Sequence, residues 1–136
     1  MEQFGQTGTS RSRDEKEFVP SDAKPVSKEI TPVTNSNVTL WTVTADNFLF
    51  IENFGVCNID GGAITVTVHV VPSGGAAANG NKVYDALAVA ANVTVSLDAF
   101  KSMQIAPLSF IVAVTSSATG ANFWLSGFET VGAGRL

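Results

Sequence analysis

The distribution of charge constrains this chain most, because it changes abruptly near residue 37. Eleven of the twenty formal charges lie between Glu2 and Glu29, in a stretch with only scattered apolar residues. A segment of this kind buries too little apolar surface to offset the entropy lost when its backbone is ordered. We therefore expect residues 1–37 to form an extended or disordered N-terminal arm that is ordered only where a partner holds it.

The apolar residues of this expected arm stand singly between prolines. Pro20, Pro25 and Pro32 interrupt any helix there, so that residues 14–17 could form one helical turn and no more. Single apolar side chains on an extended segment suit a strap that docks onto a neighbouring subunit, and a disordered tail is the alternative. On the strap interpretation, four residues are candidate interface residues: Phe4, Phe18, Val26 and Ile30.

Residues 38–136 read as one β domain. They carry only nine charges and consist of short Val, Thr, Ile and Phe segments separated by Gly, Asn, Asp and Pro. Segments at roughly ten-residue spacing, without helical periodicity, are typical of an antiparallel β-sandwich or jelly roll. We expect about seven strands, over residues 38–43, 47–57, 63–71, 83–89, 92–98, 108–115 and 122–131.

The segment 63–71 alternates most clearly. Its branched aliphatic residues all fall on one side: Ile64, Val66, Val68 and Val70. This side is predicted to face the core, since a one-residue slip would move all four into water. Thr67 and His69 fall on the other side, which we expect to be solvated. The preceding Asp60-Gly61-Gly62 is predicted to be a hairpin turn.

The last expected strand, 122–131, is apolar on both faces. Phe123 and Leu125 lie on one face, and Trp124 and Phe128 on the other. One sandwich core can hide only one of these pairs, so we expect Trp124 and Phe128 to be buried at a subunit contact, where aromatic anchors dominate binding. The alternative is that a loop at 99–107 covers them. Trp41 is a further candidate interface residue.

The residues that could carry chemistry are too few for an enzyme. His69 is the only imidazole and Cys57 the only thiol, so neither a zinc site nor a disulfide framework within one chain can form. No Gly-x-Ser-x-Gly element accompanies the histidine. We predict no catalytic, cofactor or metal site, Cys57 as a small buried hydrophobe, and aspartates that cap turns.

Charge and hydropathy also bear on partners. The formal net charge is −4, without a basic stripe, so we expect no nucleic-acid contact. The start of the chain lacks the apolar region of a secretory signal, and no apolar run is long enough for a membrane span, so we expect no membrane contact. The charged fraction, 15%, lies below the ~25% of typical soluble domains, which favours a homo-oligomer with covered surface.

Four stretches carry a resemblance to a known group of proteins. They are 68–75 (VHVVPSGG), 81–84 (NKVY), 88–98 (AVAANVTVSLD) and 123–129 (FWLSGFE). Together they resemble small β-sandwich modules of tailed bacteriophage virions, and the likeness covers about residues 38–131. It implies a non-enzymatic structural protein of the virion, made in the host cytoplasm.

Among such modules, the first expectation is a capsid decoration (cement) protein that binds the major capsid protein with its β-body and arm. A neck, tail or fibre component is the first alternative. The second is a carbohydrate-binding module for host attachment, because Trp41, Tyr84 and Trp124 carry rings that can stack on sugars.

Overall fold

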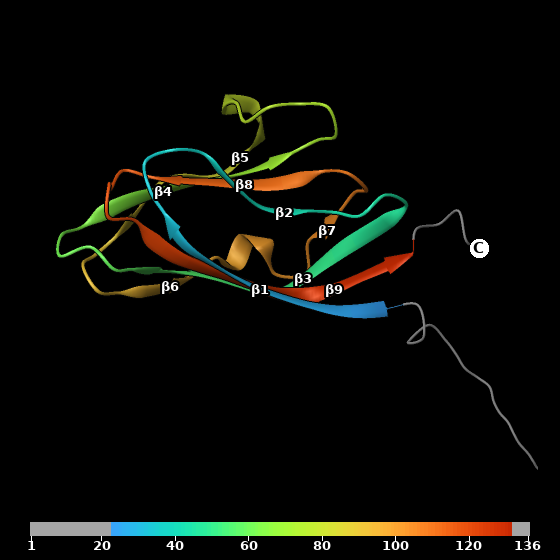
Figure 1. The fold of residues 1–136 in the computed structure, drawn as a ribbon, viewed down its shortest axis with the longest axis horizontal. Helices are drawn as coiled ribbons and strands as arrows, with labels where there is room; N and C mark the ends of the chain where they lie inside the picture. The colour runs from blue at the N-terminus through green and yellow to red at the C-terminus, as the bar shows by residue number, and fades with distance from the viewer. Residues whose placement is uncertain (1–22, 132–136) are drawn as a thin grey trace, which may run out of the picture.

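The computed structural model describes residues 23–131, and this part of the chain is all-β. Two sheets lie one above the other (Figure 1). The described residues also form two short 3-10 turns, η2 (Asn79–Asn81) and η3 (Asp98–Phe100). The strands are β1 (Ala23–Val33), β2 (Val38–Thr42), β3 (Asn47–Asn58), β4 (Ile64–Val71), β5 (Lys82–Val89), β6 (Thr94–Ser96), β7 (Gln104–Ile105), β8 (Phe110–Thr115) and β9 (Ala121–Val131).

Every strand pairing is antiparallel. The larger sheet has the order β1-β9-β3-β6, with β7 also paired to β3, and the smaller has the order β2-β8-β4-β5. If β6 and β7 are counted as one interrupted strand beside β3, this is the eight-stranded order of a jelly roll. The predicted fold class, an antiparallel β-sandwich of the jelly-roll kind, is confirmed.

The sheet begins earlier in the chain than the charge pattern predicted. β1 lies within the expected arm of residues 1–37, yet it pairs with β9 from Ala23 opposite Thr130 to Val33 opposite Ala121. An edge strand needs only one partner and a few apolar contacts, and Val33 and Val26 supply these by packing against the core. Charges near such an edge remain in water, so a high charge density does not prevent pairing.

The core lies between the two sheets. The predicted inner side of β4 is confirmed, since Ile64, Val66 and Val68 are buried and Val70 packs against them in part. Phe123 and Leu125 of β9, in the larger sheet, are buried on the other side of the core. The η3 turn adds Phe100, whose ring meets that of Phe54 edge-on at 4.8 Å between centroids.

The Asp60-Gly61-Gly62 turn does not form the predicted hairpin. β3 belongs to the larger sheet and β4 to the smaller, so this turn carries the chain from one sheet to the other. Asn58 holds the crossing, because its side-chain amide donates to the backbone oxygens of Gly62 and Val89 at 2.9 and 3.2 Å. The glycine-rich sequence therefore indicates that the chain changes direction here, but it does not indicate which strand pairs with β4.

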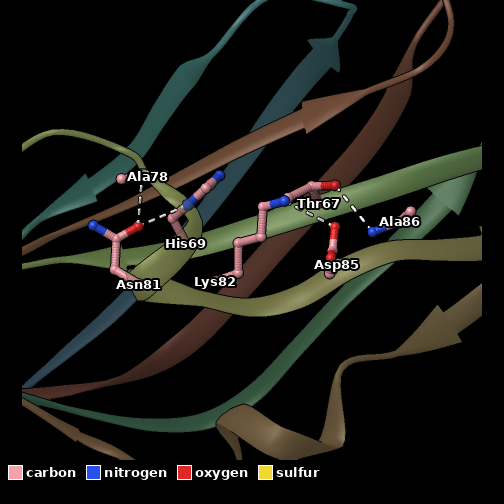
Figure 2. Close-up of polar contacts among 7 residues, drawn as sticks. All are labelled: Thr67, His69, Ala78, Asn81, Lys82, Asp85 and Ala86. Carbon is pink, nitrogen blue, oxygen red and sulfur yellow. Dashed lines mark hydrogen bonds and ion pairs between the residues drawn. The ribbon is translucent and has the colours of Figure 1, made fainter.

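The prediction that His69 is solvated is wrong: the residue is buried, with 5% of its surface exposed. The β4–β5 connection folds over the outer side of the smaller sheet and places Asn81 Oδ1 2.8 Å from His69 Nδ1 (Figure 2). Asn81 Oδ1 also accepts from the N–H of Ala78, and Asn81 Nδ2 donates to the oxygen of Ala76. These bonds fix the amide orientation, so His69 Nδ1 carries the hydrogen.

Strand β5, which follows this connection, contains a bulge. Ala86 has a φ of 54°, and its N–H donates to Thr67 Oγ1 at 3.0 Å (Figure 2). Lys82 Nζ pairs with Asp85 Oδ1 at 3.0 Å on the exposed side. The outer side of the smaller sheet is therefore partly covered by the protein's own chain.

The burial of β4 predicts a contrast between two aspartate substitutions. Val68→Asp places an unpaired charge in the core and should lower the free energy of unfolding by at least about 3 kcal/mol, whereas Thr65→Asp, on the exposed side of the same strand, should change it by less than about 1 kcal/mol. Urea unfolding followed by far-UV circular dichroism measures both. Equal midpoints for the two variants would contradict the orientation of β4.

Candidate assembly surface

Aromatic side chains gather on the outer side of the larger sheet, which we call the aromatic face and define by Phe48, Phe50, Trp124 and Phe128. Residues opposite one another in antiparallel strands share a face. Phe50 and Phe128 are such a pair, and their rings stack with centroids 5.4 Å apart and planes 25° apart. Phe48 lies opposite Thr130. All four aromatic residues are half-buried.

The indole ring of Trp124 lies over its neighbour in β3 because that neighbour has no side chain. Gly55 of β3 is directly opposite Trp124, and a Cβ added at Gly55 would overlap the six-membered ring of the indole. The glycine thus provides a seat for the ring, an arrangement known to compensate for glycine within sheets. The position and orientation of Trp124 are built into the strand pairing.

A shallow groove of about 380 Å³ lies beside the stacked phenylalanines. The 99–107 link forms one wall, held to β3 by the N–H of Ser102, which donates to the oxygen of Ile51 at 2.9 Å. This link lines the groove but leaves Phe50 and Phe128 half-exposed. The two charged residues of the lining have opposite signs, and the full lining is Phe50, Ile51, Glu52, Lys101, Ser102 and Phe128.

The structure brings together only part of the predicted interface set. Trp124 and Phe128 share the aromatic face, whereas Val26 packs against the core from the inner side of β1. Trp41 belongs to β2 in the smaller sheet. The backbone of Ile30 lies opposite Phe123. Two further predicted residues, Phe4 and Phe18, lie outside the described residues.

Trp41 and Glu129 join the two sheets. Trp41 Nε1 donates to Glu129 Oε2 at 2.8 Å, and Asn47 Nδ2 donates to the other carboxylate oxygen at 3.0 Å. Lys28 Nζ lies 5.8 Å from the centre of the Trp41 ring, within the range of a cation–π contact. The indole is therefore engaged within the fold, at the side where edge strands β1 and β2 approach each other.

Glu129 is buried, with 5% of its surface exposed, and sequence reasoning missed it. Burial alone raises the pKa of this carboxyl, but hydrogen bonds from Asn47, Thr44 and Trp41 outweigh that effect and hold the pKa below its ordinary value. The available signal was its position in β9, two residues beyond Gly127 on the alternation that carries Phe123 and Leu125.

The remaining polar candidates serve the fold. Asp60 accepts a short hydrogen bond from Ser117 Oγ and another from the N–H of Gly62, and these bonds lower its pKa. Asp98 accepts from Ser96 Oγ at 2.7 Å. Both aspartates thus stabilise turns, as aspartate commonly does. Cys57, predicted as a buried hydrophobe, is a half-buried free thiol on β3.

The three rings considered for sugar stacking do not share a surface. Tyr84 belongs to β5, where its hydroxyl accepts from the N–H of Ala99 at 2.8 Å and its ring stacks on Phe100. Trp41 faces Glu129, and Trp124 lies on the outer side of the other sheet. Within residues 23–131, no three His, Cys, Asp or Glu side chains lie close enough to hold a metal ion.

The chain was compared with known proteins in three ways. No protein-family model matches it, and no curated protein matches it either. A solved structure described as a Bacillus endospore appendage, from a family of disulfide-linked pili, aligns with a TM-score of 0.45 and 13% identity over 88% of this chain and 99% of that chain. A likeness of this size is no evidence about function. No helix among the described residues is long and apolar enough to cross a membrane.

The hydrogen bonds of Glu129 predict a pH-dependent difference between this protein and its Glu129→Gln variant. Because folding lowers the pKa of Glu129, its contribution to stability is present above the ordinary value of 4.5 and is lost as the pH falls through the lower folded value. The variant should be about 1–3 kcal/mol less stable at pH 7, with the difference shrinking below pH 4.5.

Urea unfolding from pH 7 to pH 3 measures this difference. Glu52→Gln, at an exposed position in β3, is the matched control and should follow the unmodified protein at every pH. A stability difference for Glu129→Gln that stays constant down to pH 3 would contradict the role assigned to the carboxylate.

Proposed function

We propose that this protein is a structural subunit of a protein assembly and that it attaches through the aromatic face. The observation that carries the proposal is the cluster of Phe48, Phe50, Trp124 and Phe128 on the outer side of the larger sheet, where the 99–107 link borders the groove but leaves all four residues partly exposed. Partly exposed aromatic rings at a groove are typical anchors of protein interfaces. Contiguous apolar patches on an otherwise polar surface mark interaction sites.

The edge next to this face favours contact through the face over strand addition. β1 carries Pro25, which cannot donate a backbone hydrogen bond. Lys24 and Lys28 fall on the inner alternation of this strand, opposite Glu129 and Leu125, and their side chains are exposed at the edge. Prolines and inward-pointing charges are devices that prevent an edge strand from pairing with another chain. The β1 edge is thereby protected, and the aromatic face beside it is not.

Within this class we propose the role of a capsid decoration protein of a tailed bacteriophage. Support comes from the resemblance of residues 38–131 to virion modules and from the low charge of the domain. Residues 1–22 precede the edge strand, and in this role they would strap the subunit to the major capsid protein or to a neighbouring decoration subunit. A neck, tail or fibre position uses the same face and is distinguished by the particle that the protein binds.

Removing the rings of the aromatic face should abolish attachment without unfolding the domain. In the double variant Trp124→Ala, Phe128→Ser, we expect binding to purified phage heads that lack the protein to fall at least about 30-fold, because two anchors are lost. Co-sedimentation measures attachment, and thermal melting measures folding. The double variant Thr39→Ala, Thr65→Ala, on the other sheet, is the control and should bind normally.

Three outcomes would count against the proposal. Full attachment of the double variant Trp124→Ala, Phe128→Ser would show that the aromatic face does not mediate attachment. Loss of its cooperative melt would show that the rings are needed for the fold of a single chain. Binding of the unmodified protein to glycans, and not to heads or tails, would favour the carbohydrate-binding alternative.

A further inference from the structure

We propose that two copies of this chain pack with their aromatic faces against each other, about a two-fold axis that passes beside Ser126. The inference rests on the proposed function and deepens it: the occupant of the aromatic face is a second copy, and the pair, not the aromatic face of one copy, contacts the particle. The outer side of the smaller sheet is partly covered by the β4–β5 connection, over His69 and Val71. On the aromatic face, by contrast, the 99–107 link borders only the groove, and all four aromatic residues remain partly exposed.

The outward residues of β9 read the same in both directions. From one end of the strand to the other they are polar, aromatic, small, aromatic and polar: Asn122, Trp124, Ser126, Phe128 and Thr130. A two-fold interface uses the same patch on both copies, so the patch must be complementary to itself. An axis beside Ser126 places Trp124 of each copy against Phe128 of the other.

The groove completes this arrangement. It lies beside Phe128 and Phe50, which is where the axis brings the Trp124 ring of the second copy. The small side chain of Ser126 lets the two sheets approach to the ~10 Å spacing of packed sheets. None of the five outward residues of β9 is charged, and the groove charges, Glu52 and Lys101, are of opposite sign, so the contact brings no like charges together at its centre.

The size of the face is adequate for a pair. The larger sheet has four strand positions, with β6 and β7 sharing the one beside β3, and at ~4.8 Å spacing these span about 19 Å. A strand as long as β9, with its 11 residues, spans about 37 Å. One sheet face therefore offers roughly 700 Å², close to the ~800 Å² per partner of a standard stable interface. A segment that fills only the groove would leave most of this face in water.

Site-specific crosslinking tests both the pair and the position of its axis. In full-length protein with Cys57→Ser, a short bismaleimide should join two copies of Ser126→Cys, because a residue on the axis meets itself. Asn122→Cys and Thr130→Cys should crosslink when the two variants are mixed, and neither should crosslink with itself. Thr65→Cys, exposed on the other sheet, is the control for random collision.

The expected result is at least about tenfold more covalent dimer for Ser126→Cys than for Thr65→Cys, and a weakening of the pair of about 30-fold by Trp124→Ala in sedimentation. Melting curves establish that each variant is folded. Crosslinking of folded Ser126→Cys no faster than the control would overturn the inference. If particles bind the protein as a monomer, the pairing inference fails and the proposed function stands. If the protein pairs but never enters a particle, the proposed function fails and the pairing inference stands.

Discussion

β9 is apolar on both of its faces, and the rest of the molecule follows from how those two faces are used. The inner face, with Phe123 and Leu125, closes the core against the smaller sheet. The outer face, with Trp124 and Phe128, cannot enter that core, because side chains alternate across a strand. Burial of apolar area outside the single chain is therefore the physical basis of the proposed assembly role.

Two local devices hold this strand in place. Gly55 leaves room for the Trp124 ring against β3, and Glu129 accepts hydrogen bonds from Trp41 and Asn47 inside the sandwich. A buried carboxylate is tolerated only when its oxygens are paired, so the bonds also fix where β2 lies relative to β9. The aromatic face thus has a rigid base, which reduces the entropy that a partner must overcome on binding.

Alternation was the strongest guide from sequence to structure. It located the inner side of β4 at Ile64, Val66 and Val68, and it recognised the two-sided strand that became β9. Charge density was a poor guide at β1, because an edge strand keeps its lysines in water while its backbone pairs with β9. Turn chemistry at residues 60–62 predicted a reversal but not the crossing between sheets.

Local sequence patterns could not predict contacts between segments that are far apart in the chain. His69 is covered by Asn81, which lies at the far end of the β4–β5 connection. Glu129 accepts a hydrogen bond from Trp41, 88 residues earlier in the sequence. Neither partner is indicated by periodicity, since only the tertiary fold brings them together. For the same reason Trp41 and Trp124, grouped from sequence as interface residues, occupy different parts of the molecule.

Hydroxyl-radical footprinting of the full-length protein measures whether a second copy buries the aromatic face. Labelling of Phe50, Trp124 and Phe128 is read by mass spectrometry at low and high protein concentration, with exposed Leu108 as the internal reference. Burial of the aromatic face by a second copy predicts that labelling of all three rings falls several-fold as concentration rises, while Leu108 is unchanged. Ring labelling that stays constant across the concentration range would contradict the account.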